Sequence, residues 1–158
     1  MGMGSGCYSE VRLTVSRADI EQEIVSRAEA WMASAGLAVT FAGANCDLNA
    51  PLGWAIRQAG GSVTTPSLVT STDVQTVAAA DYDMLLDLAE LRTLQSILAN
   101  FSAVDKKAGP VELKSSQLGE RIERRIAQLR AWLATAYGIG GSATLTTGVL
   151  NLNFAEAS

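Results

Sequence analysis

The amino-acid sequence predicts a mainly α-helical fold: a small bundle of three main helices plus one short helix, followed by an extended C-terminal β-prone tail or hairpin. Three observations lead to this prediction. Apolar residues recur at helical spacing in three separate segments. Turn-forming and capping residues flank those segments. The last segment, 138–158, instead alternates apolar and polar residues. A chain of 158 residues is long enough for one core, so we expect a helical domain over 1–137 and an arm over 138–158.

The first predicted helix covers Ser16–Ala35. Ser16 is a suitable N-cap, and Asp19 stands three residues later, as in a capping box. Gly36 is a natural C-terminal stop. The residues at helical spacing that form its apolar stripe are Ile20, Ile24, Ala28, Trp31 and Ala35.

The next segment, 37–72, reads as a loop-rich insertion. Leu37–Phe41 is β-prone and short, which leaves a strand or an extended link open. A short helix is expected over Ala50–Ala59, capped by Asn49 and with Pro51 in its first turn. Ser62–Thr72 is rich in Ser and Thr and is predicted to be a loop.

The longest helix is expected over Ala78–Asn100, with Asp73 starting a short lead-in turn. Its apolar residues cover most of the helix circumference, which is typical of a helix that is buried on several sides. We therefore expect either a central position in the bundle or a face that packs on a neighbouring subunit. These residues are Met84, Leu85, Leu88, Leu91, Leu94, Ile97, Leu98 and Phe101.

The third main helix is predicted over Ser116–Tyr137, after a connector at 102–114. Glu120 and Arg124 are four residues apart in the favoured order for an ion pair on one helix face. The narrow apolar stripe of this helix consists of Leu118, Ile122, Ile126, Leu129, Leu133 and Ala136.

The tail, 138–158, contains no Lys or Arg and a single acid, Glu156. Ala143–Thr147 and Val149–Phe154 are predicted to be short strands separated by Gly148. In the second strand apolar residues alternate with asparagines, as in a half-buried strand. Such a strand is suited to pairing with another chain. The candidate partner-binding residues of the tail are therefore Val149, Leu150, Leu152 and Phe154.

Composition excludes several classes of function. Charged residues make up only 18% of the chain, against a usual value of about 25%. The low-charge parts, 37–72 and 138–158, are those that the sequence does not fit into a self-contained bundle, so we expect them to be buried against other chains. The net charge of -4 disfavours nonspecific binding of nucleic acid. We find neither a signal peptide nor an apolar run long enough to span a membrane.

No catalytic or metal site is expected. The chain contains no histidine, which removes the commonest general base and the commonest zinc ligand. Cys7 and Cys46 are too far apart for a CxxC pair. We therefore predict a protein that is not an enzyme and that uses no cofactor and no metal.

Charges are segregated along the second half of the chain. Acids gather at the start of the central helix, where they face its positive end, although a cation site is the alternative; they are Asp81, Asp83, Asp87 and Glu90. Arginines gather on the third helix as further candidate partner-binding residues; they are Arg121, Arg124, Arg125 and Arg130. We expect them to pair with Glu120 and Glu123 or with the acids of another subunit, since copies docked side by side would match charges across the seam. A phosphate contact is the alternative.

Three stretches together resemble the head–tail connector proteins of tailed bacteriophages, also called adaptor or head-completion proteins. They are DYDMLLDLAELRTLQSILAN (81–100), VDKKAGPVELKSSQ (104–117) and GERIERRIAQL (119–129), and the resemblance covers Thr72–Tyr137. It implies small α-helical subunits that form a ring, typically twelvefold, beneath the portal. Such rings extend the DNA channel and receive the next neck component, and their extended termini reach into neighbouring proteins.

The resemblance also implies where the protein acts and with what. We expect a structural virion protein at the head–tail interface, made in the cytoplasm of the bacterial host. Its expected partners are other copies of itself, the portal protein and the next neck or tail-completion protein. Genomic DNA would pass through the channel without sequence-specific binding, and no membrane is involved. The alternative is a small oligomeric helical binding or regulatory module of a mobile element, also non-enzymatic.

Overall fold

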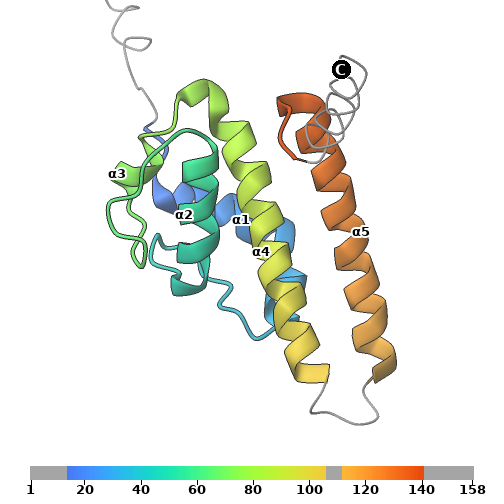
Figure 1. Ribbon diagram of the computed structural model, residues 1–158. Helices are drawn as coiled ribbons and strands as arrows, with labels where there is room; N and C mark the ends of the chain where they lie inside the picture. The colour runs from blue at the N-terminus through green and yellow to red at the C-terminus, as the bar shows by residue number, and fades with distance from the viewer. Residues whose placement is uncertain (1–13, 106–111, 141–158) are drawn as a thin grey trace, which may run out of the picture.

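The computed structural model describes residues 14–105 and 112–140 and is mainly α-helical, as predicted (Figure 1). No strand occurs in these two ranges. The elements in chain order are α1 (Arg17–Ser34), the 3₁₀ turn η1 (Cys46–Leu48), α2 (Asn49–Gln58), α3 (Ser71–Val74), the 3₁₀ turn η2 (Ala79–Asp81), α4 (Tyr82–Asp105) and α5 (Glu112–Tyr137).

Helix α1 begins and ends where its sequence predicts. The Ser16 hydroxyl accepts a hydrogen bond from the Asp19 backbone N–H at 3.2 Å, and the Ser16 backbone N–H donates to Asp19 Oδ2 at 2.8 Å. This confirms the capping box. The hydrogen bonds from Ser16 hold the pKa of Asp19 below its ordinary value. Within the apolar face Met32 is fully buried, whereas Trp31 is only half-buried.

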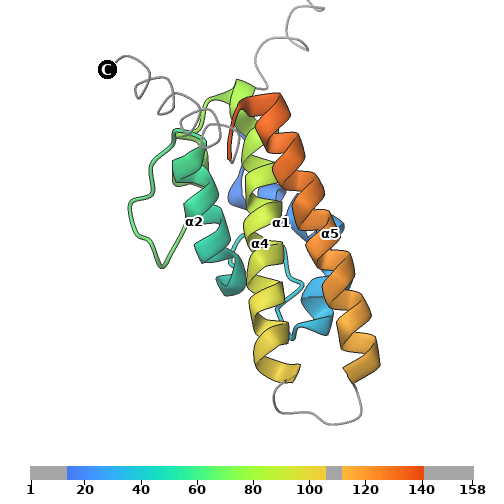
Figure 2. The same cartoon turned by 45° about the vertical axis from the view of Figure 1, so that its right-hand side comes forward.

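Helix α4 lies at the centre of the molecule. It packs against α1, α2 and α5, and it stands between α2 and α5 in both views (Figures 1 and 2). Leu88 and Leu94 have no exposed surface. Of the two alternatives for this helix, a central position within one chain is therefore confirmed.

Helix α5 runs antiparallel to α4 (Figure 2). At 26 residues it is longer than α4, at 24, so the prediction that the central helix is the longest is wrong. The helix starts at Glu112, four residues before the predicted start at Ser116. The inner face of α5 follows the predicted stripe, and its buried members are Ile122, Ile126, Leu129 and Leu133.

The chain reverses direction directly after α5. Gly138 has φ +67°, the left-handed conformation that favours glycine. Its backbone N–H donates to the Ala134 carbonyl, and the N–H of Ile139 donates to the Leu133 carbonyl, both at 3.1 Å. These two bonds satisfy the last carbonyls of the helix and turn the chain back toward the bundle.

Segment 37–72 packs onto the bundle, so the expectation that it does not fit a self-contained fold is wrong. Leu37–Phe41 has no regular structure, which leaves the extended link of the two alternatives. The short helix is present as α2, but Asn49 does not cap it and lies inside it. A lead-in turn is present as α3, but a capping box between Thr70 and Asp73 starts it at Ser71, two residues before the predicted start at Asp73. Apolar residues in and just after the segment complete the core; they are Leu48, Leu52, Ala55, Ile56, Val69, Val74 and Val77.

Candidate functional site: the groove between α2, α4 and α5

The four arginines predicted on α5 have different surroundings. Arg125 donates from Nε to Glu90 Oε1 at 2.8 Å and from Nη2 to Glu90 Oε2 at 3.2 Å. Arg121, Arg124 and Arg130 are exposed and form no ion pair within the described part of the chain. The expected pairing with Glu120 or Glu123 is therefore absent there. Arg125 binds across the helix seam, and the other three remain available.

Two acids of α4 belong to a network that joins three helices. Glu90 is only 1% exposed and receives Arg125 from α5 and Arg27 from α1. Arg27 Nη1 lies 3.1 Å from Asp87 Oδ1 and 3.2 Å from Glu90 Oε2. Trp132 of α5 donates from Nε1 to Asp87 Oδ2 at 2.9 Å. Each carboxylate is thus used to hold helices together.

The pKa of Arg27 reflects this network. Partial burial alone would lower it, but hydrogen bonds to Glu23, Asp87 and Glu90 outweigh burial and raise the pKa above its ordinary value. Arg27 therefore stays charged. Among the described residues no group of three or more His, Cys, Asp or Glu side chains is placed to hold a metal ion.

A second charged cluster lies at the N-terminal end of α1. Arg17 is 2% exposed. It donates from Nε to Glu21 Oε1 at 2.7 Å, from Nη2 to the Asn45 carbonyl at 2.7 Å, and from Nη1 to Asn49 Oδ1 at 2.6 Å and to the Val69 carbonyl. One guanidinium thus joins α1, η1, α2 and the loop before α3. We call this cluster the Arg17 hub.

Glu21 and Asn45 complete the Arg17 hub. Glu21 accepts from the backbone N–H groups of Gly43 at 2.7 Å and of Asn45 at 3.0 Å. The Asn45 side chain donates to the carbonyls of Ala38 and Thr40. The described part of the chain contains no buried side-chain polar atom without a hydrogen-bond partner. The buried polar side-chain atoms of the hub therefore all have hydrogen-bond partners. We interpret the hub as a structural cluster and not as a candidate binding or catalytic site.

An aromatic pair is exposed at the C-terminal end of α5. Trp132 is 53% exposed and Tyr137 37%, and their rings meet edge to face with centroids 6.5 Å apart. Trp132 is thus not a core residue, because Leu129 and Leu133 occupy the seam with α4. Partial burial, and then the nearby charges of Asp87, Asp83 and Asp81, raise the pKa of Tyr137.

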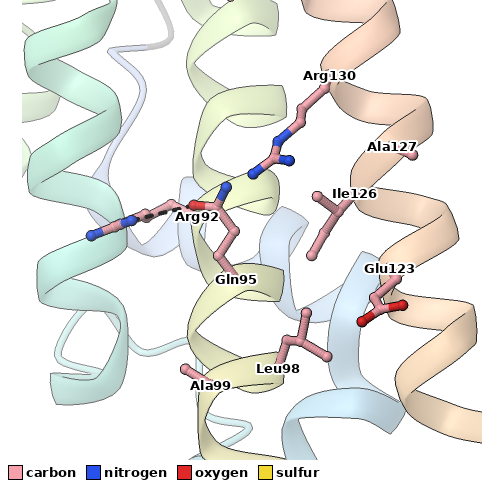
Figure 3. Close-up of a pocket in the computed structure, with 8 residues that line it drawn as sticks. All are labelled: Arg92, Gln95, Leu98, Ala99, Glu123, Ile126, Ala127 and Arg130. Atoms are coloured by element: carbon pink, nitrogen blue, oxygen red, sulfur yellow. Dashed lines mark hydrogen bonds between the residues drawn. The ribbon is translucent and has the colours of Figure 1, made fainter. Parts of the chain in front are cut away.

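A groove lies over α4, between α2 and α5. It consists of two adjoining hollows of about 650 and 570 Å³ that share Gln95 and Arg130. Figure 3 shows the first hollow, where Leu98 of α4 and Ile126 of α5 lie between the longer polar side chains. The second hollow is more apolar, and its walls include Trp54, Leu88, Leu91, Leu133 and Ile139.

Two guanidinium groups border this groove. Arg92 lies over the Trp54 ring, 5.7 Å from its centroid, and donates from Nη1 to Gln95 Oε1 at 3.3 Å (Figure 3). Arg130 extends from α5 toward α4 and forms no ion pair with a described residue. Glu123 places one carboxylate at the far border of the first hollow (Figure 3). A groove with an apolar floor and two guanidinium groups fits an apolar chain whose own carboxylate lies beside Arg130 and away from Glu123.

Of the predicted site residues, the groove therefore contains only Arg130. Arg92 and Trp54 were not predicted, because they meet only when α2 packs on α4 and no local pattern marks them. The tail candidates Val149, Leu150, Leu152 and Phe154 lie outside the described residues, as does the predicted hairpin.

Comparisons with known proteins add no relative. No family model matches the chain, no curated protein matches it, and no solved structure matches it. In the described ranges, every helix is too short or too polar to cross a membrane.

Proposed function

We propose that this chain is a structural, non-enzymatic subunit of a ring that joins the capsid of a tailed bacteriophage to its neck or tail. The ring docks beneath the portal and extends the channel through which DNA passes without being read. This proposal rests on the resemblance over Thr72–Tyr137, whose helical part forms α4 and α5. The subunit is made in the cytoplasm of the host and becomes part of the virion.

The outward side of α5 is the observation that carries the proposal. It exposes Arg121 and Arg124 without carboxylate partners among the described residues, and it ends in the aromatic pair of Trp132 and Tyr137. Exposed arginines and aromatic residues are enriched at protein interfaces. Such a surface suits contact with other copies or with the portal protein.

The antiparallel arrangement changes how the charges of two copies would match. The first acids of α4 lie beside the C-terminal end of α5, whereas Arg121 and Arg124 lie in its first half. If two copies docked side by side at the same height along the helix axis, acids would lie beside acids and arginines beside arginines. Charge matching therefore favours neighbours that are offset along the helix axis.

Light scattering after size-exclusion chromatography tests the proposal, with and without a portal protein of a tailed bacteriophage. We expect a mass that corresponds to a ring, or to a complex with the portal. A Trp132→Ala, Arg124→Glu double variant should lose this assembly and remain folded. Leu68→Ala, which removes an exposed apolar side chain far from α5, is the control. A small dimer that is indifferent to the portal would contradict the proposal.

The groove favours a second candidate function, a small oligomeric helical binding or regulatory module of a mobile element. A concave apolar site with two cationic borders is a feature of peptide-binding modules. The same light-scattering measurement separates the candidates, since this module would form a small oligomer and ignore the portal.

A further inference from the structure

We propose that, in the free subunit, the groove between α2, α4 and α5 holds the C-terminal segment Val149–Glu156 of its own chain. This inference rests on the groove and on the sequence of the tail. It does not depend on the ring proposed above. A segment held in the groove would be unable to bind a partner until it is released.

The end of the described chain leads into the groove. Ile139 and Gly140 are themselves part of its wall. The hydrogen bonds of Gly138 and Ile139 at the end of α5 turn the chain back, and Figure 2 shows it descending between α5 and α2. The segment that follows therefore starts at the groove and not on a distant face.

The tail is long enough to cover the groove. The wall that α4 contributes runs from Leu88 to Ala99, about 16 Å at 1.5 Å per helical residue. Leu150 stands ten positions after Gly140 in the sequence, and an extended chain of ten steps reaches about 33 Å. The linker can therefore form a loop and still place the segment along the whole groove.

The chemistry of the segment complements that of the groove. Leu150, Leu152 and Phe154 alternate with asparagines, so an extended chain would direct all three toward one side. The groove presents an apolar floor to such a face. Glu156 is the one charged residue of 138–158, and Arg130 at the junction of the two hollows has no carboxylate partner among the described residues.

The length of the linker decides between the same chain and a second copy. A short flexible connection gives the tethered segment an effective concentration in the millimolar range. A second copy at micromolar concentration competes at a large disadvantage. The occupant in dilute solution is therefore the chain's own segment.

Disulfide trapping in the full chain tests this inference. Cys7 and Cys46 are first replaced by Ser, and Leu152→Cys, on the side of the segment that would face the groove, is combined with Ala127→Cys, which lies in the groove wall. The matched control combines Leu152→Cys with Gln128→Cys, an exposed position of α5 outside the groove wall. We expect the groove pair to oxidise about tenfold faster than the control pair, as for a docking free energy of about 1.4 kcal/mol. On a denaturing, non-reducing gel the disulfide should join two cysteines of the same chain at every protein concentration.

Charge reversal gives a second, independent readout. Arg130→Glu should slow trapping of the groove pair, and adding Glu156→Lys should restore it, because the ion pair is re-formed with its charges exchanged. Equal trapping rates for the two cysteine pairs, or disulfide-linked dimers whose yield rises with protein concentration, would overturn the inference. Neither result bears on ring formation, which the light-scattering measurement reports separately.

Discussion

Two regions of this molecule are held in the fold by different forces. The α4–α5 pair is joined mainly by a continuous apolar seam, in which Leu94 and Ile122 have no exposed surface. Segment 37–49 and the loop before α3 instead meet α1 through the Arg17 hub. Irregular backbone cannot satisfy its own polar groups, so a buried guanidinium and carboxylate supply the missing partners. Low charge in a sequence therefore does not mean that a segment lacks a place in the core.

Removing the charge at the centre of the Arg17 hub should cause the largest loss of stability. Arg17→Met keeps much of the side-chain volume but leaves Glu21 as a buried, uncompensated carboxylate. We expect the free energy of unfolding to fall by about 4 kcal/mol, measured by urea denaturation. Arg57→Ala, at an exposed position, is the control and should change it by less than about 0.5 kcal/mol. A small effect of Arg17→Met would show that backbone donors suffice for Glu21.

Truncating the apolar seam should cost somewhat less. Leu94→Ala leaves a cavity at a fully buried position of α4, and we expect a loss of about 3 kcal/mol. Leu68→Ala, at a position that is 55% exposed, is the matched control. Thermal unfolding followed by circular dichroism would measure both variants. Equal midpoints would contradict the central place of α4 in the core.

A pair of glycine substitutions should have opposite signs in the two regions. A Cβ at Gly61 would lie 2.7 Å from Thr76 Oγ1 and 2.8 Å from Ile56 Cγ2, so Gly61→Ala should lose about 1–2 kcal/mol of stability. A Cβ at Gly119, inside α5, would meet no atom within 4 Å. Gly119→Ala should therefore gain about 0.5–1 kcal/mol, because alanine favours the helix. Denaturant midpoints with the same sign in both variants would contradict these two environments.

The smallest of these effects on stability is expected at acidic pH, where protonation of Asp73 should destabilise the 62–76 region. Burial alone would raise the pKa of Asp73, but hydrogen bonds from Thr64 and Thr70 outweigh it and lower the pKa below its ordinary value of 3.8. The folded state thus binds this proton less readily than the unfolded state. Its contribution is present above pH 3.8 and is lost as the pH falls through the lower folded value.

The Asp73→Asn variant isolates this contribution. We expect it to be less stable than the unsubstituted chain at neutral pH, and the difference should shrink as the pH falls below 3.8. Urea denaturation at several pH values measures both curves. A difference that stays constant with pH would assign the effect of the substitution to shape and not to charge.

Local patterns predicted the helices well and the contacts between them poorly. The Ser16 capping box and the stripe of α5 depend on residues three or four apart, so the sequence displays them directly. The partner of Arg125 is Glu90, 35 residues away, and that of Arg17 includes Val69, 52 residues away. No periodicity links such residues. Asn49 looked like a cap because its side chain is an acceptor, but that acceptor serves Arg17 and the Val69 N–H instead.

The Arg17 hub also has a consequence for the time course of folding. It joins groups 28, 32 and 52 residues apart in the chain, so a long loop must close before these three bonds can form. Contacts of this kind tend to form late, after local helical structure. Disruption of the hub should then chiefly accelerate unfolding and leave the refolding rate nearly unchanged. The hub would therefore lengthen the lifetime of the native state without changing how fast that state forms.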